Sequence, residues 1–313
     1  MKDVKKPLRT RVYIDGYNFY YGCLKNTHHK WLDLLGLFKN YILPSVLVRV
    51  EGQPAKFELL PLSIKFFTAV ILEKAAKADD SVSCQAKYHS ALRKKYDGQI
   101  EIIEGYYSLI ESKAKIVDAE KPETWPKYCQ EITVWKLEEK QSDVNLALQA
   151  YHDSITGEVD HVVIVTNDTD IAPSLKLIRE HTDVIVGLVV PTSDHVRIPN
   201  VDLAKYSHWV RTHITNDELK NSQLPRVIFG GRNPATKPES WYPNQVIFEQ
   251  IMLLGSSVLG KRNQVFRWLN TENPYFQGKA PIELIEQEEG AKEVLKYMQD
   301  YIASKAQSSP ELL

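Results

Sequence analysis

Short apolar runs and helical periods alternate along this chain. Five runs rich in β-branched and aromatic residues predict strands, and they are 10–15, 62–71, 100–105, 161–166 and 183–190. Apolar residues recur with helical spacing in four intervening segments, which are 31–43, 81–96, 143–151 and 173–181. Strands that alternate with helices predict parallel βαβ units. The expected fold class is therefore α/β, with an open, mainly parallel sheet and a core of five strands.

Two segments break this alternation. Residues 108–140 form a charged insertion that carries Trp125 and Trp135 and is longer than the usual connection, so we expect a flap over the active edge. Residues 216–243 lose periodicity and collect proline and glycine. Beyond them the helical period returns, which predicts a small helical domain. The predicted division is an α/β domain over 8–213, a linker or wrapping segment over 214–245 and a helical interaction domain over 246–305.

Composition and charge narrow the classes of function. Hydrophobic residues make up 43% of the chain and the mean hydropathy is −0.33, as in globular proteins. Lys and Arg number 39 against 40 Asp and Glu, so any nucleic-acid contact must be local. Cys23, Cys84 and Cys129 lie far apart, which argues against a zinc knuckle or a disulfide framework. With no apolar stretch of about 18 residues, we expect a cytoplasmic protein without a membrane span.

Acidic residues follow two predicted strands and begin one predicted helix. Asp15 ends the first strand, Asp168 and Asp170 follow the strand 161–166, and Asp143 begins the helix before that strand. Ligands of open α/β sheets bind beyond the carboxyl ends of the strands, so these acids converge if the two strands are neighbours. Their repulsion would be relieved by protons or by a divalent cation, and oxygen ligands favour Mg²⁺ or Mn²⁺. The alternative to a metal site is that each acid has only a local structural role. An Asp after a strand would then form an Asx-turn, and Asp143 or Asp170 would be a helix N-cap.

The blocks around these acids resemble the NYN domain, a branch of the PIN-like nuclease superfamily that includes LabA-like proteins. The matching blocks are 12–18, 140–148 and 163–171, and the resemblance covers roughly residues 8–213. It implies a metal-dependent ribonuclease with Mg²⁺ or Mn²⁺ as cofactor and RNA as partner. The resemblance assigns both catalysis and metal binding to four acids, Asp15, Asp143, Asp168 and Asp170.

Four polar residues near these acids are expected to contact the substrate. Asn18 lies three residues after Asp15, and the resemblance makes it the polar companion of the acids. Asn167 stands directly before Asp168, where the NYN family has glycine. His195 and Arg197 follow the strand 183–190 at the same sheet edge, where they would contact phosphate.

The C-terminal segment resembles the toxin-binding domain of Xre/MbcA/ParS-type antitoxins. The resemblance rests on Trp268-Leu269, Asn273-Pro274, Gly278, Pro281 and Glu289-Gly290, and it spans about residues 246–303. It implies that the helical domain 246–305 docks a protein partner or self-associates. The structural alternative is a helical cap that packs on the sheet.

Three functions remain open from the sequence. The first is a metal-dependent endoribonuclease that hydrolyses RNA phosphodiesters at the carboxylate cluster and carries a C-terminal interaction domain. The second is a non-catalytic RNA-binding or toxin–antitoxin scaffold. The third is an oxidoreductase, because some proteins that resemble the whole architecture carry the name of a pyridine-ring hydroxylase, 6-hydroxy-3-succinoylpyridine 3-monooxygenase. The chain has no GxGxxG fingerprint to hold a dinucleotide, so we prefer the nuclease.

Overall fold

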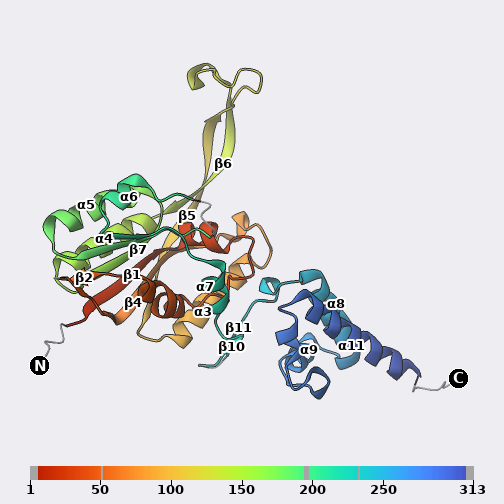
Figure 1. Ribbon diagram of the computed structural model, residues 1–313. Coiled ribbons are helices and arrows are strands. Elements are labelled where there is room, and N and C mark those ends of the chain that lie inside the picture. Colours follow the sequence, from red (N-terminus) through yellow and green to blue (C-terminus); the bar gives the residue numbers. More distant parts are fainter. Residues whose placement is uncertain (1–5, 51, 194–196, 232, 308–313) are drawn as a thin grey trace, which may run out of the picture. The chain divides into compact units, whose positions relative to one another are not determined.

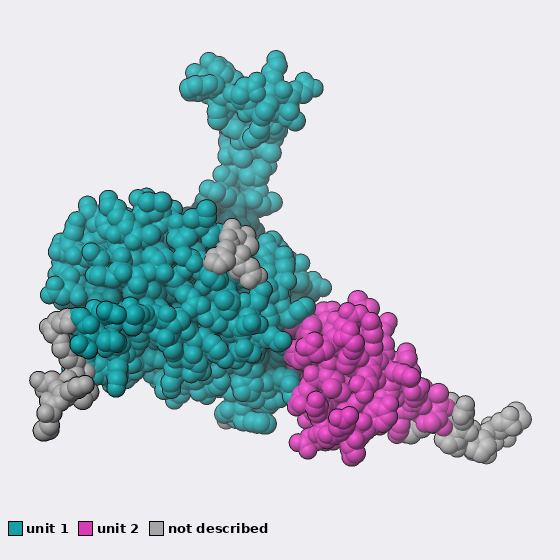
Figure 2. Space-filling model, in the orientation of Figure 1, with its two compact units in different colours: residues 1–237 teal, residues 238–313 magenta. Residues whose placement is uncertain are grey.

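The chain divides into two compact units. The computed structural model describes residues 6–50, 52–193, 197–231 and 233–307 (Figure 1). Unit 1 is Met1–Lys237 and unit 2 is Pro238–Leu313, so the boundary lies within the proline- and glycine-containing segment 214–245 (Figure 2). Each unit has its own cluster of buried hydrophobic residues.

Unit 1 is built on a large sheet. In the described part of the chain, seven strands follow the order β6-β5-β4-β1-β7-β8-β9. All neighbouring pairs are parallel except β5 and β6, which are antiparallel. The strands are β1 (Leu8–Asp15), β4 (Phe57–Val70), β5 (Ile100–Lys115), β6 (Glu131–Lys140), β7 (His161–Val165), β8 (Ile185–Val189) and β9 (Trp209–Arg211). The structure confirms the predicted α/β class with an open, mainly parallel sheet.

The prediction of five strands was wrong, because β6 and β9 give weak signals in the sequence. β6 mixes charged and apolar residues and contains no buried residue, so it resembles a solvated insertion. β9 is only three residues long. Two small antiparallel pairs lie outside the main sheet, β2 (Arg49–Val50) with β3 (Gln53–Pro54) and β10 (Val227–Ile228) with β11 (Ala235–Thr236).

Helices cover both faces of the sheet (Figure 1). On one face lie α4 (Ser142–Ile155), α5 (Ala172–His181) and α6 (Val201–Lys205), whose buried residues pack against β1, β7 and β8. On the other face α3 (Ser81–Lys95) contacts β5, β10 and β11. The predicted continuous helix over 31–43 is broken into α2 (Leu34–Leu37) and a π-helical turn, η2 (Phe38–Ile42). A similar pair, α1 (Gly16–Phe19) and η1 (Tyr20–Leu24), follows β1.

The predicted insertion 108–140 forms an arm. β5 pairs with β4 only as far as Tyr106, and from Tyr107 onward it pairs with β6 alone. The two strands project away from the rest of unit 1, so the arm does not fold back as a flap over its own sheet edge (Figure 1). We call residues 107–139 the arm and residues 116–130 its tip.

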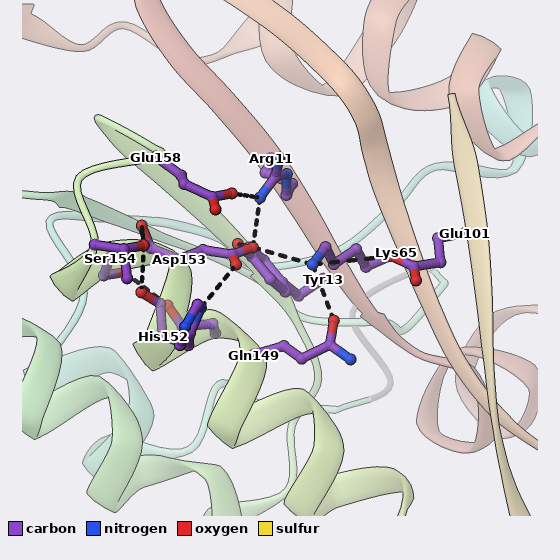
Figure 3. A network of polar contacts seen from close by, with 11 residues as sticks. Arg11, Tyr13, Lys65, Glu101, Gln149, His152, Asp153, Ser154 and Glu158 are labelled. Atoms are coloured by element: carbon purple, nitrogen blue, oxygen red, sulfur yellow. Dashed lines mark hydrogen bonds and ion pairs between the residues drawn. The ribbon is translucent and has the colours of Figure 1, made fainter. Parts of the chain in front are cut away.

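A buried polar network joins α4 to the sheet (Figure 3). The Asp153 Oδ2 atom accepts hydrogen bonds from the Arg11 Nη1 atom and the Tyr13 hydroxyl, both at 2.6 Å. It also lies 3.2 Å from the Lys65 ammonium, and Arg11 forms a second ion pair with Glu158. Burial raises the pKa of Asp153, but its hydrogen bonds from Tyr13 and Arg11 outweigh burial and hold that pKa below its usual value.

Unit 2 is a small helical domain. Its helices are α8 (Gln245–Leu259), α9 (Arg262–Leu269), α10 (Pro281–Leu284) and α11 (Glu288–Gln307). Phe248, Ile251, Val265 and Val294 are among the residues that form its core. Each helix overlaps a segment whose helical period is visible in the sequence. None of the described helices combines the length and the apolarity needed to cross a bilayer.

One short helix precedes unit 2 in a segment that shows no periodicity in the sequence. α7 (Asn216–Asn221) has only six residues, too few to show a period. It begins with a capping box, in which the Thr215 hydroxyl accepts from the Glu218 backbone N–H and the Glu218 carboxylate accepts from the Thr215 N–H. The segment 214–245 therefore contains regular structure.

Candidate functional site

The four predicted acids lie at one edge of the sheet. β1 and β7 are parallel neighbours, with Ile14 beside Val165, so the residues that follow these strands emerge side by side. Asp15 is buried, Asp143 and Asp168 are half-buried, and Asp170 is exposed. We call Asp15, Asp143, Asp168 and Asp170 the carboxylate edge. Their roles in catalysis and metal binding stay predictions.

Asp15 is held rigidly by its neighbours. Its Oδ1 atom accepts from the Asn18 backbone N–H at 2.9 Å, which caps α1. Its Oδ2 atom accepts from the Asn18 side-chain amide and from the Thr166 hydroxyl, both at 2.7 Å. Burial raises the pKa of Asp15 in spite of these hydrogen bonds. Asn18, predicted to contact substrate, thus has its amide committed to Asp15.

Gly16 allows the chain to turn sharply after Asp15. A Cβ atom at this position would lie 2.6 Å from the Phe67 carbonyl oxygen of β4, closer than real Cβ contacts. Any other residue would push α1 away from the sheet and shift Asp15 with it. The glycine therefore serves the packing of α1 against β4.

Capping explains Asp15 and Asp168 but neither Asp143 nor Asp170, because the N-cap of α1 is Asp15 and the N-cap of α5 is Ile171. Asp168 caps the 3₁₀ turn η6 (Thr169–Ile171), and its Oδ1 atom accepts from the Asp170 backbone N–H at 3.0 Å. Asp143 lies inside the first turn of α4, whose N-cap is Gln141 with a φ of 75°. The local alternative therefore fails for Asp143, because this carboxylate is not the cap of α4.

Asp143 has the electrostatics of a proton-transfer group. Burial, followed by the negative charges of Asp15, Asp168 and Glu139, raises the pKa of Asp143 from 3.8 to about 7. A carboxyl group with such a pKa exchanges protons near neutral pH, as general acid–base catalysis requires. Perturbed carboxylates in a cleft are candidates for functional sites.

Glu139 is a member of the site that sequence reasoning missed. It lies at the end of β6, and burial raises its pKa. The Tyr107 hydroxyl donates to its Oε2 atom at 3.3 Å, while its Oε1 atom is buried without a hydrogen-bond partner among the described residues. The sequence offered only one signal, its position four residues before Asp143.

Tyrosine rings from α1 and η1 stand beside the acids. The rings of Tyr17 and Tyr21 have centroids 4.5 Å apart, and Tyr20 meets Tyr21 edge to face at 5.3 Å. Tyr17 is 45% exposed, and its pKa is raised by partial burial, by Tyr21 and by the charges of Glu139 and Asp15. The edge therefore combines carboxylates with exposed aromatic surface, on which a planar ring can stack.

The other residues that were predicted to contact the substrate have different surroundings. Both ends of the Asn167 side-chain amide are engaged, donating to the Ile198 carbonyl at 3.1 Å and accepting from the Asn200 N–H at 2.9 Å. It thus braces the loop before α6. Arg197 lies near Cys23 and lowers the pKa of that thiol, although burial raises it to about 12. His195 lies outside the described residues.

The described carboxylates do not fit a metal centre. Across residues 6–50, 52–193, 197–231 and 233–307, no three His, Cys, Asp or Glu side chains are placed to share one ion. Both oxygens of Asp15 are occupied by hydrogen bonds, and one oxygen of Asp168 caps a turn. The Mg²⁺ or Mn²⁺ cofactor stays a prediction from the sequence, and we derive no step through it.

Replacing Asp143 with asparagine is expected to stabilise the protein at alkaline pH. The folded-state pKa of Asp143 is raised from 3.8 to about 7, so its contribution to stability is complete below about pH 4 and is lost as the pH rises through 7. Allowing for solvent screening, the loss is about 1–2 kcal/mol. Asp143→Asn should match the parent near pH 4 and melt roughly 2–8 °C higher at pH 8. Calorimetry across this range checks it, and a difference independent of pH would contradict it.

Comparisons with known proteins give one extensive match. A protein of Pseudomonas putida named 6-hydroxy-3-succinoylpyridine 3-monooxygenase HspA is 59% identical over 300 residues, which cover 95% of this chain and 96% of its own. Residues 254–299 match the antitoxin Xre/MbcA/ParS C-terminal toxin-binding domain. A solved protein of unknown function from Vibrio parahaemolyticus is 16% identical with a TM-score of 0.35, covering 69% of this chain and 98% of its own.

These matches correct the predicted reaction. The ribonuclease and hydrolase predictions are wrong, because the relative that matches almost the whole chain is named as a monooxygenase. RNA as a partner has no support from these matches. The physical reason is that acids at strand ends create an anionic, proton-exchanging edge without fixing which reaction it serves. The antitoxin-type resemblance is confirmed for residues 254–299. None of these matches confirms the NYN resemblance of residues 8–213, which stays a prediction.

Proposed function

This chain belongs to the family of the Pseudomonas putida 6-hydroxy-3-succinoylpyridine 3-monooxygenase, and from that membership we propose that it is an oxidoreductase that oxygenates a hydroxypyridine. The observation that carries the proposal is 59% identity over nearly the full length of both proteins. The substrate class is a hydroxypyridine with an acyl side chain that ends in a carboxylate.

The proposed reaction balances with an external reductant. One atom of O₂ enters the organic product and the other leaves as water, which consumes two electrons and two protons. In the assay below, NADH is supplied as the reductant, either alone or together with a flavin. The sequence has no GxGxxG fingerprint, and Asp15 and Asp168 place negative charge beyond the carboxyl ends of β1 and β7, where such a fingerprint binds phosphate. We therefore derive no step through a flavin or nicotinamide.

The carboxylate edge and its tyrosines suit the substrate's chemistry. A hydroxypyridine presents an acidic proton on its oxygen or ring nitrogen, and losing that proton raises the electron density of the ring. In this proposal Asp143, with a pKa near 7, accepts the proton. Tyr17 offers an exposed aromatic face on which the ring can stack. Hydrogen bonds from Asn18 and Thr166 hold Asp15 in place, and the negative charge of Asp15 helps to raise the pKa of Asp143.

A turnover assay tests the function directly. Purified protein is incubated in air with 6-hydroxy-3-succinoylpyridine and NADH, with and without added flavin, and the pyridine is followed by chromatography. We expect loss of the pyridine matched by NADH oxidation in at least one condition. Persistence of the pyridine in all of them, with NADH or NADPH and with FMN or FAD, would remove the proposal.

We further propose that the helical domain, residues 246–305, binds a protein. The support is the match of residues 254–299 to a toxin-binding domain family. The proposed limits of the α/β domain are 8–213, with 214–245 as the connecting segment.

A further inference from the structure

The outer edge of β6 has the properties of a docking surface. β6 is the last strand of the sheet, and within the part of the chain that the structure describes, no strand pairs with its outer side. It is ten residues long, about twice the common strand length. An open edge of this length presents unpaired backbone groups that favour pairing with another strand.

The arm cannot bury its own apolar residues. Beyond Tyr106 it is only two strands wide, and isolated two-stranded hairpins are marginally stable in water. Trp135 on β6 is 68% exposed and Leu137 is 44% exposed. In the tip, Trp125 and Tyr128 are 70% and 74% exposed. Figure 2 shows the arm standing clear of the rest of unit 1.

We propose that a second copy of this chain docks on the outer edge of β6, strand against antiparallel strand, around a two-fold axis at Leu137. Among axes from Trp135 to Glu138, the charges of β6 favour the one at Leu137. When the axis lies at Leu137, Lys136 faces Glu138 of the partner subunit, and the reverse pair forms as well. An axis at Trp135 places Glu131 against the partner subunit's Glu139. An axis at Lys136 or Glu138 places like charges on the axis itself, which destabilises the pair.

Antiparallel pairing also brings the tip of one arm to the site of the other copy. β6 runs from the tip at Glu131 to the start of α4, where Asp143 lies. A partner strand that runs the opposite way therefore ends with its tip beside the carboxylate edge. Trp125 and Tyr128 of the partner subunit would then add to the aromatic surface that Tyr17 offers there, a consequence that rests on the proposed function. The dimer itself does not depend on that function.

A designed disulfide tests the interface. In a Cys129→Ser background the remaining native cysteines, Cys23 and Cys84, are buried. Leu137→Cys should then give a covalent dimer under mild oxidation, because strands paired at the axis bring the two Cα atoms within the disulfide range of about 4.4–6.8 Å. Ile110→Cys, equally exposed at 44% but on β5, is the matched control and should stay monomeric in denaturing gels. No covalent dimer from Leu137→Cys, or equal amounts from both variants, would overturn the proposal.

Sedimentation of the unoxidised protein gives an independent readout. The parent should sediment as a dimer, and Leu137→Glu should raise the dimer dissociation constant at least about tenfold by placing two carboxylates on the axis. Ile110→Glu should leave the constant unchanged. A parent that stays monomeric at high concentration would overturn the proposal. Because neither readout uses the substrate, failure of the dimer and failure of the oxygenase are distinguishable.

Discussion

Asp153→Asn is expected to destabilise unit 1 by about 3–5 kcal/mol, because it removes the buried carboxylate that two buried cations share and leaves them only the exposed carboxylates of Glu158 and Glu101. Arg11 and Lys65 are both about nine-tenths buried, and the same carboxylate oxygen of Asp153 serves each of them. That oxygen also accepts from the buried Tyr13 hydroxyl. The substitution removes the charge while keeping the size of the side chain. Urea unfolding followed by circular dichroism measures the change.

A surface ion pair supplies the control for this prediction. Asp160 contacts Arg9 with a short distance of 2.7 Å, but both side chains are about one-third exposed. Asp160→Asn should therefore cost about 1 kcal/mol or less. If Asp153→Asn and Asp160→Asn have equal effects, the network in Figure 3 does not hold α4 to the sheet in the manner described.

Asp143→Asn is expected to lower kcat/KM for the hydroxypyridine by about 10²–10⁴-fold, the range typical for loss of a general acid–base group. Asparagine keeps the shape of the side chain but cannot take up a proton. The loss should fall mainly on kcat, because the stacking surface of Tyr17 is unchanged. Steady-state kinetics with the assay described above measure both constants.

Asp183→Asn is the matched control for the kinetic prediction. Asp183 is exposed and precedes β8, at the amino ends of the parallel strands and thus opposite the carboxylate edge, so its loss should leave kcat and KM within about twofold of the parent. An Asp143→Asn variant as active as Asp183→Asn would show that Asp143 does not transfer the proton. Its higher melting temperature at pH 8 would then be a purely structural effect.

The sequence predicted the strands whose residues are buried on both faces. Strands β1 and β7 consist almost entirely of buried residues, and such runs are visible as apolar, β-branched stretches. β6 was not predicted, because charged and hydrophobic residues are mixed along it and it lies on a solvated arm. The continuous helix predicted over 31–43 was also wrong, because the α-helix begins only at Leu34 and gives way to a π-helical turn after Leu37.

The candidate site was predictable only in part. Asp15, Asp143 and Asp168 follow from a general rule, since residues at the carboxyl ends of parallel strands meet at one edge. Glu139 does not follow from it, because β6 is antiparallel and its last residues reach that edge from the arm. Asn167 and Asn18 were expected to meet substrate, yet each has its amide bound to a neighbouring segment of the chain.

The reaction could not be predicted from these residues. Crowded carboxylates create a negative field and raised pKa values, and both metal-dependent hydrolysis and proton transfer to an organic substrate use such a field. The correction from hydrolysis to oxygenation therefore comes from the relative that matches almost the whole chain, which is named as a monooxygenase. The three-dimensional structure adds the hydrogen bonds to both oxygens of Asp15, which hold that carboxylate in place.

The most direct test of the central claim is turnover of 6-hydroxy-3-succinoylpyridine under ¹⁸O₂. The purified chain is supplied with the pyridine, NADH and flavin, and the products are analysed by mass spectrometry. The account predicts that the pyridine product carries one ¹⁸O atom when the gas is labelled and none when only the water is labelled. Label that enters from water, or no product under any reductant, would contradict the assignment of this chain as a monooxygenase.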